Sequence, residues 1–130
     1  MVIDSSALAC LLFDEPEAER MEAVIEADPV RLLSTGTLLE ISLVIQARLG
    51  EAGVRELDLL LMKASVETLD FTAEQVDLAR HAYRTFGKGK HPAGLNFGDC
   101  FSYAASAVSG EALLYKGGDF GRTDVVPVQY

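Results

Sequence analysis

Four acidic residues of this chain lie beside or within apolar segments, where carboxylates are uncommon. Removing water from a lone carboxylate is unfavourable unless the group is paired, neutralised or bound to a metal ion. Because the four acids are spread along the whole chain, they predict one carboxylate cluster that the fold assembles. The four residues are Asp4, Glu40, Asp99 and Asp119.

Such a cluster predicts a divalent cation, because carboxylates without a cation between them repel one another. Mg²⁺ and Mn²⁺ prefer oxygen ligands, and in such a site they polarise a phosphodiester and activate water. Zinc is not expected, since His81 and His91 are isolated and neither Cys10 nor Cys100 has a partner at metal-ligand spacing. Both cysteines lie in apolar segments and are expected to be reduced core residues, which favours a cytoplasmic location.

Each acid also has a purely structural explanation. Asp4 could cap a helix, and Asp99 could be a first-turn acid that the helix dipole favours. Glu40 could form an ion pair with Arg48, and Asp119 could be a turn residue.

Three further polar residues could belong to the same site. Ser6 and Asn96 could orient the carboxylates or hydrogen-bond water on the metal, and helix capping explains both equally well. Asp124 is another candidate acid in the region of Asp119.

A basic segment precedes Asp99. From Leu78 to Gly98 the sequence contains no acid, and the segment leads directly into the predicted cluster. Its cations could hold nucleic-acid phosphates beside the metal, although a solvated helix end would look the same. The predicted nucleic-acid-binding residues are Arg80, Arg84, Lys88 and Lys90.

Short apolar strands alternate with helices, which predicts an α/β fold with a parallel sheet flanked by helices. Ser5 or Ser6 is expected to cap the first helix, and Gly50 to end the third. Acids that follow strands should meet at the carboxyl edge of such a sheet. The expected strands are Val2–Asp4, Val30–Ser34, Val66–Asp70, Ala112–Tyr115 and Val125–Val128. The expected helices are Ala7–Phe13, Pro16–Ala27, Thr35–Leu49, Gly53–Ala64, Thr72–Phe86 and Phe97–Ser109.

Composition limits the function. A chain of 130 residues with 49% hydrophobic residues fits one globular domain. The net charge of −9 argues against a protein that coats nucleic acid, but it allows an enzyme that meets nucleic acid at one small site through metal ions. No signal peptide or membrane span is evident, so no membrane partner is expected.

The order of four segments resembles a PIN-domain ribonuclease of the VapC toxin type, and the resemblance covers essentially the whole chain. It implies a single PIN domain over residues 1–130, a three-layer α/β sandwich, and cleavage of RNA by the toxin half of a type II toxin–antitoxin pair. The segments are Val-Ile-Asp-Ser-Ser-Ala from residue 2, Thr-Leu-Leu-Glu-Ile from residue 37, Asn-Phe-Gly-Asp-Cys-Phe-Ser-Tyr-Ala from residue 96, and Leu-Leu-Tyr-Lys-Gly-Gly-Asp-Phe-Gly-Arg-Thr-Asp from residue 113.

The resemblance also implies roles for the four acids. Asp4 and Asp99 match the usual metal ligands, Glu40 the third acid and Asp119 the fourth. Asp4, Glu40 and Asp99 would hold Mg²⁺, or Mn²⁺, for in-line attack of water on phosphorus. Asp119 would help to hold a second ion or would orient the water. Many PIN domains carry one more acid two residues before the last one, where this chain has Gly117.

The resemblance implies two protein partners, a second copy of the chain and a cognate antitoxin. The apolar helices from Thr35 to Ala64 are the candidate surface for both. The alternative function is a non-catalytic PIN-fold module that binds RNA or protein. Receiver domains and haloacid-dehalogenase-type phosphatases are not favoured, because Asp4-Ser5-Ser6 lacks the second acid that they need. The loop from Gly87 to Lys90 does not match a phosphate-binding loop.

Overall fold

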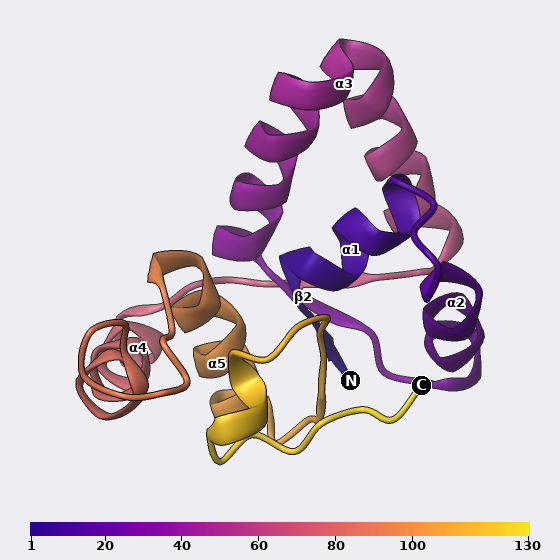
Figure 1. Ribbon diagram of the computed structural model, residues 1–130. Helices are drawn as coiled ribbons and strands as arrows, with labels where there is room; N and C mark the ends of the chain where they lie inside the picture. The colour runs from indigo at the N-terminus through magenta and orange to yellow at the C-terminus, as the bar shows by residue number, and fades with distance from the viewer.

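The computed structural model describes all residues from 1 to 130, and it contains one parallel sheet with helices on both faces (Figure 1). The strand order is β3-β2-β1-β4, and Val2 of the central strand β1 pairs with Leu32 on one side and Leu113 on the other. The strands are β1 (Val2–Ile3), β2 (Leu32–Ser34), β3 (Glu67–Leu69) and β4 (Leu113–Leu114). The helices are α1 (Ser5–Leu12), α2 (Ala18–Ala27), α3 (Thr35–Lys63), α4 (Ala73–Phe86), α5 (Phe97–Ser109) and the short 3-10 helix η1 (Phe120–Arg122).

Successive strand residues point to opposite faces of the sheet, and this alternation builds two cores. Ile3 and Leu33 belong to the core under α1, α2 and α3. Val2 and Leu32 belong to the core under α4 and α5, together with Phe120. The predicted three-layer α/β arrangement is therefore confirmed.

The helix starts follow capping chemistry, with one correction to the predicted caps. Asp4, rather than Ser5 or Ser6, caps α1, since its carboxylate accepts the Ser6 N–H at 3.0 Å. Ser34 caps α3 by accepting the Gly36 N–H. Asp4 directly follows β1 and Ser34 is the last residue of β2, so the chain passes from strand to helix without a loop.

Gly50 divides α3, as the sequence predicts. Its φ of 66° and ψ of −161° are not helical, and this region of backbone conformation is open to glycine almost alone. The two halves of α3 fold back on each other in an inverted V (Figure 1). The second half begins at once rather than at Gly53.

The predicted strand Val125–Val128 is wrong. Only an isolated parallel bridge joins Leu113 to Pro127 there. Leu113 donates to Val126 O at 2.8 Å and accepts from Val128 N at 2.9 Å. These two hydrogen bonds form one bridge that does not extend into a ladder, so the segment stays an edge contact.

None of the helices combines the length and the hydrophobicity that a membrane span needs.

Candidate metal centre

The fold brings the four predicted acids to the carboxyl edge of the sheet. Asp4 directly follows β1, Glu40 lies in the second turn of α3, Asp99 lies in the first turn of α5, and Asp119 follows β4. The charges of Asp4, Asp119 and Glu40 all raise the pKa of Asp99, which places the four carboxylates in one electrostatic neighbourhood. Parallel strands end on the same side, and each following helix starts there.

Asp4 is held rigidly in this cluster. It is 2% exposed, and its Oδ2 accepts the Ser6 hydroxyl at 2.6 Å while its Oδ1 accepts the Ser102 hydroxyl at 2.6 Å. The Ser102 hydroxyl also lies 3.1 Å from the Thr37 hydroxyl. Asp4 is thus both a helix cap and a member of the cluster, with its orientation fixed by two serines.

Glu40 is the acid with the strongest sign of a missing partner. Its Oε2 is buried and has no hydrogen-bond partner, although buried polar atoms are nearly always satisfied. Burial raises the pKa of Glu40, the charge of Asp4 raises it further, and a hydrogen bond from Ser5 lowers it. The predicted alternative pairing with Arg48 is not found, since the Arg48 guanidinium lies over the Phe13 ring, 5.2 Å from its centroid.

The Glu40 carboxylate rests directly on the backbone of Gly98. A Cβ at Gly98 would lie 2.1 Å from Glu40 Oε1, far inside van der Waals contact. Only glycine lets the start of α5 approach this closely.

Asp99 takes part in a helix cap, and its carboxylate lies in an environment that disfavours negative charge. Its Oδ2 accepts the Asn96 N–H at 2.8 Å and the Asn96 side chain accepts the Asp99 N–H at 2.9 Å, which forms a capping box. Burial raises the pKa of Asp99 to about 6; the backbone hydrogen bond from Asn96 lowers it, and the neighbouring acids raise it. Its other oxygen makes no hydrogen bond within the protein and is free for a ligand.

The two acids in the loop after β4 have different surroundings: Asp119 is among the charges that, after burial, raise the pKa of Asp99, and Asp124 is not. Asp119 is exposed and caps nothing with its side chain, whereas Asp124 accepts the Tyr103 hydroxyl at 2.9 Å. Gly117 has a φ of 104°, a conformation that strains an L-residue. An acid at that position would therefore be unfavourable in the conformation that this loop adopts.

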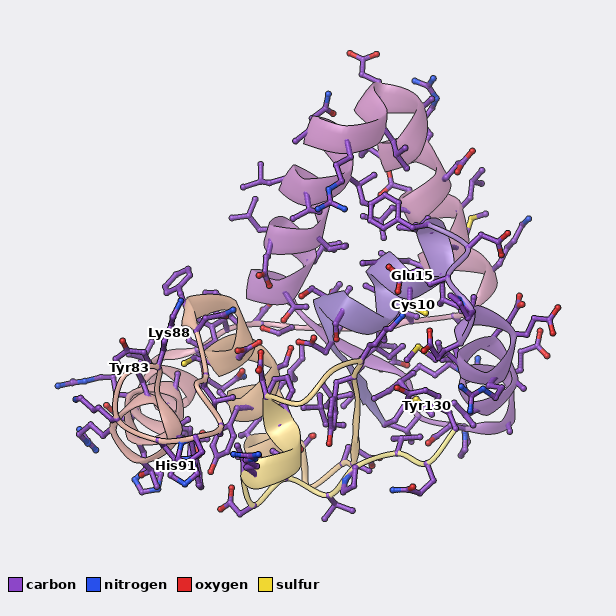
Figure 2. All side chains as sticks on the ribbon, viewed as in Figure 1. Cys10, Glu15, Tyr83, Lys88, His91 and Tyr130 are labelled. Carbon is purple, nitrogen blue, oxygen red and sulfur yellow. The ribbon has the colours of Figure 1, made fainter.

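The basic segment lies beside the start of α5. Lys88 N donates to Leu95 O at 2.9 Å, which ties the loop after α4 to the residue before Asn96. Lys90 Nζ lies 5.9 Å from the Tyr83 ring centroid, and Arg80 and Arg84 are on the exposed face of α4. Figure 2 shows Lys88, Tyr83 and His91 together on this side of the molecule, far from Cys10 and Tyr130.

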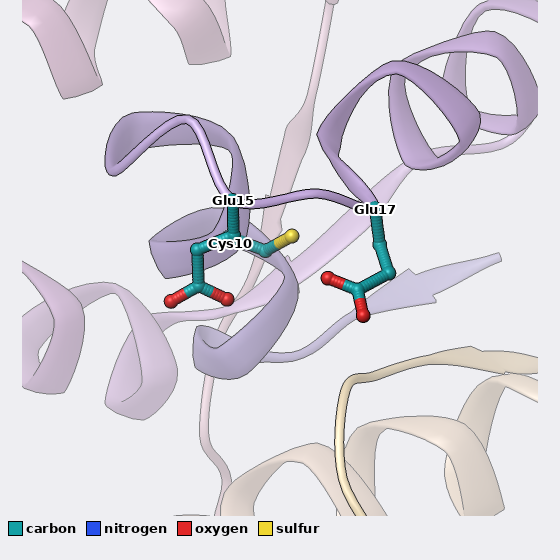
Figure 3. A group of neighbouring side chains, drawn as sticks. All are labelled: Cys10, Glu15 and Glu17. Carbon is teal, nitrogen blue, oxygen red and sulfur yellow. The ribbon is translucent and has the colours of Figure 1, made fainter.

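One further group of possible metal ligands was not predicted. Ligand atoms of Cys10, Glu15 and Glu17 all lie within 4.8 Å of one another (Figure 3). No three of the four predicted acids meet that spacing, as expected for like charges with no cation between them. The Lys116 ammonium already contacts both glutamates of the new group, at 2.6 Å for Glu17, so the chain itself supplies the cation.

The sequence analysis missed the residues that orient the acids: Thr37, Gly98 and Ser102. Helical spacing could have revealed two of them. Ser102 lies three residues after Asp99 and Thr37 three residues before Glu40, so each shares a helix face with an acid.

Comparisons with known proteins agree with this architecture. The model of the PIN domain family matches residues 1–126. Ribonuclease VapC30 of Mycobacterium tuberculosis is 59% identical over 128 residues, which cover 98% of each chain. The chain therefore belongs to the PIN domain family. Within that family it belongs with the VapC ribonucleases, and the resemblance drawn from the sequence is confirmed.

Two solved structures show the same fold at low sequence identity. The crystal structure of M. tuberculosis VapC20, a toxin that cleaves the sarcin–ricin loop, has a TM-score of 0.77 at 20% identity and covers 99% of this chain and 98% of that chain. The VapBC2 complex of Rickettsia felis, bound to a DNA fragment from its promoter, has a TM-score of 0.78 at 12% identity, with 98% and 96% covered.

Proposed function

We propose that this chain is a metal-dependent endoribonuclease, the toxin of a type II toxin–antitoxin pair, and that it hydrolyses RNA phosphodiester bonds. The observation that carries the proposal is the buried Glu40 Oε2 without a partner, next to two further acids, Asp4 and Asp99. The VapC relatives support the same activity. We also propose that residues 1–130 act as a single domain.

The donor set fits Mg²⁺ or Mn²⁺. Asp4, Glu40 and Asp99 offer only carboxylate oxygens, the ligands that these ions prefer. Glu40 and Asp99 each keep an oxygen without a protein partner. Burial raises the pKa of both, and neighbouring acids raise it further, an environment that a bound cation would favour. The chemistry that a bound cation supplies is polarisation of the phosphodiester and activation of water.

The chain's own residues prepare this site. Ser6 and Ser102 fix the Asp4 carboxylate, and Asn96 fixes Asp99 through the capping box. Asp119, which is exposed, would help to hold a second ion or would orient the attacking water. Preorganised charge of this kind is the main catalytic contribution, because no residue forms a covalent bond to the substrate.

The basic segment is the proposed RNA contact. Arg80, Arg84, Lys88 and Lys90 are all exposed, and the loop that carries the lysines is tied to the start of α5. Their cations hold phosphates on either side of the one that is cut.

Cleavage of total bacterial RNA tests the proposal. The purified chain is expected to cut RNA with Mg²⁺ or Mn²⁺ and not with chelator, and Asp4→Asn and Asp99→Asn are expected to abolish cutting. Asp124→Asn is the matched control: it removes an acid of the same region, and the new amide can still accept the Tyr103 hydroxyl. If folded wild-type protein leaves all RNA intact with every metal, the non-catalytic RNA- or protein-binding module becomes the better explanation.

The antitoxin is proposed to bind a groove between α2 and the second half of α3. The groove has a volume of about 610 Å³. Acids outnumber cations in its lining, so charge complementarity favours a basic, amphipathic antitoxin segment. The apolar lining includes Leu11, Leu12, Ile25, Leu59 and Leu60, the acids are Asp14, Glu19, Glu22, Glu26 and Glu56, and the cations are Arg31 and Lys63.

A homodimer is proposed through the first half of α3. Leu39 and Leu43 lie one turn apart, and each is 62% exposed, an unfavourable state for leucine in a monomer. Leu57, in the second half, is fully buried, so a charge there would disrupt the core rather than test the dimer. The free thiols of Cys10 and Cys100 support the proposed cytoplasmic location.

A further inference from the structure

An ion-paired lysine lies just outside the proposed metal centre. The Lys116 ammonium contacts the carboxylates of Glu15 and Glu17, at 2.6 Å for Glu17. Hydrogen bonds to Glu15 and then Glu17 raise the pKa of Lys116, and the hydrogen bond from Lys116 lowers the pKa of Glu17. Figure 3 shows the two carboxylates on the same side of the turn that joins α1 to α2.

The backbone of the same lysine reaches the metal centre. Lys116 N donates to Ser6 Oγ at 2.9 Å, and Ser6 Oγ donates to Asp4 Oδ2 at 2.6 Å. Because Ser6 donates its hydroxyl proton to Asp4, a lone pair of Ser6 Oγ accepts the Lys116 N–H. A displacement of Lys116 therefore changes the hydrogen bond that orients Asp4.

Lys116 also lies at one end of the short segment that leads to Asp119. Gly117 and Gly118 separate the two residues and have no side chains to anchor them. Glycine leaves the backbone its greatest freedom, so the ends of this segment must fix it. Lys116 holds one end through its ion pairs, and Phe120, 3% exposed in the core, holds the other.

We propose that Lys116 is a positioning residue for the metal centre. The ion pairs of Lys116 with Glu15 and Glu17 hold the loop after β4 in place. The Lys116 backbone N–H then orients Ser6 and Asp4, and the two glycines that follow place Asp119 at the metal centre. The inference rests on the proposed function, because it assigns a second layer to the proposed metal site.

If Lys116 positions a metal ligand, its loss should weaken metal binding much more than it lowers the stability of the fold. The three side chains are about one-third exposed, at 31% for Lys116, 36% for Glu15 and 28% for Glu17, and ion pairs at this exposure contribute little to folding. Loss of a residue that orients a metal ligand, by contrast, commonly weakens metal binding about 10- to 100-fold.

Lys116→Met tests the inference by calorimetric titration with Mn²⁺ beside thermal unfolding. We expect Mn²⁺ to bind about 10- to 100-fold more weakly, with the unfolding temperature of the metal-free protein nearly unchanged. The Mn²⁺ concentration for half-maximal RNA cleavage should rise in parallel. Lys116→Arg, which keeps the charge, should retain most of the affinity, and Lys63→Met removes an exposed lysine without an ion pair as the matched control.

A second variant breaks the same contacts from the other side. The double variant Glu15→Gln, Glu17→Gln removes both partners of Lys116. Neither position then carries a carboxylate that could bind Mn²⁺ itself. This variant should weaken Mn²⁺ binding as Lys116→Met does. Wild-type affinity in both variants would overturn the inference and leave the proposed function standing. Absence of Mn²⁺ binding by the folded wild-type chain would overturn both.

Discussion

At the scale of single residues, structural and functional roles coincide in the acids. Asp4 caps α1 and Asp99 completes a capping box, yet both also belong to the carboxylate cluster. The capping explanation and the site explanation considered for each acid are therefore not exclusive. A cap fixes a carboxylate at a helix start, where a ligand can reach it.

Asp99→Asn should stabilise the metal-free protein above about pH 6. Burial raises the pKa of Asp99 from 3.8 to about 6, so between these values the folded chain holds the proton more tightly than the unfolded chain. The free energy of unfolding then falls as pH rises through this range. The difference corresponds to at most ~3 kcal/mol, and solvent screening of a half-buried group reduces it to about 1–2 kcal/mol.

Urea unfolding of wild type and Asp99→Asn at pH 4 and pH 7 measures this effect. Asparagine keeps the acceptor for the Asn96 N–H, so the capping box survives. A variant that is less stable than wild type at pH 7 would show that Asp99 serves the fold rather than the site.

At the scale of elements, two glycines let the starts of α3 and α5 meet. A Cβ at Gly36 would lie 2.3 Å from the Phe101 ring, and a Cβ at Gly98 would lie 2.1 Å from Glu40 Oε1. The first contact is with a packed ring and the second with the end of a flexible side chain. The two positions should therefore respond differently to the same substitution.

Gly98→Ala should weaken metal binding more than folding. The added methyl group displaces the Glu40 carboxylate, which can swing away at a cost below about 1 kcal/mol of stability. Gly36→Ala should cost about 1–3 kcal/mol, because the Phe101 ring cannot move freely. Mn²⁺ titration and urea unfolding of both variants give the comparison, and equal loss of stability in the two would contradict it.

Gly50→Ala should destabilise the bend in α3. The φ of 66° and ψ of −161° at Gly50 are strained for alanine by about 1–3 kcal/mol. Gly121→Ala is the control, since its Cβ would meet only the Tyr115 hydroxyl at 3.7 Å. Urea unfolding should separate them, and identical midpoints would mean that α3 can straighten without loss.

At the scale of the whole molecule, charge is divided between regions. The chain carries a net charge of −9, with acids at the proposed metal centre and around the groove, while the segment from 78 to 98 has none. A local basic surface within an acidic protein suits contact with RNA at one place only. Exposed leucines on α3 add an apolar surface without a partner.

Leu39→Lys with Leu43→Lys should yield monomers. The double variant places charge on the exposed face of α3, where both leucines are 62% exposed, so the fold should survive while an apolar interface should not. Sedimentation velocity of wild type and variant measures this. Wild-type protein that sediments as a monomer at tens of micromolar, or a variant that still dimerises, would rule out this surface.

The sequence by itself determined the architecture and the acids of the candidate site. Local signals in the sequence include the hydrophobic periods of strands and helices, the cap residues and Gly50. An acid within an apolar segment can also be recognised from the sequence alone. The extra strand at 125–128 was wrong because the segment meets β4 only in a single bridge, at Leu113 and Pro127, that does not extend into a ladder.

Tertiary structure alone decided which side chains meet. Ser102 and Asp4 are 98 residues apart in sequence, and Lys116 and Glu15 are 101 apart. The close approach of Gly98 to Glu40 likewise joins two helices. No local propensity encodes such contacts, because they depend on strand order and helix packing, which arise only when the whole chain buries its apolar surface.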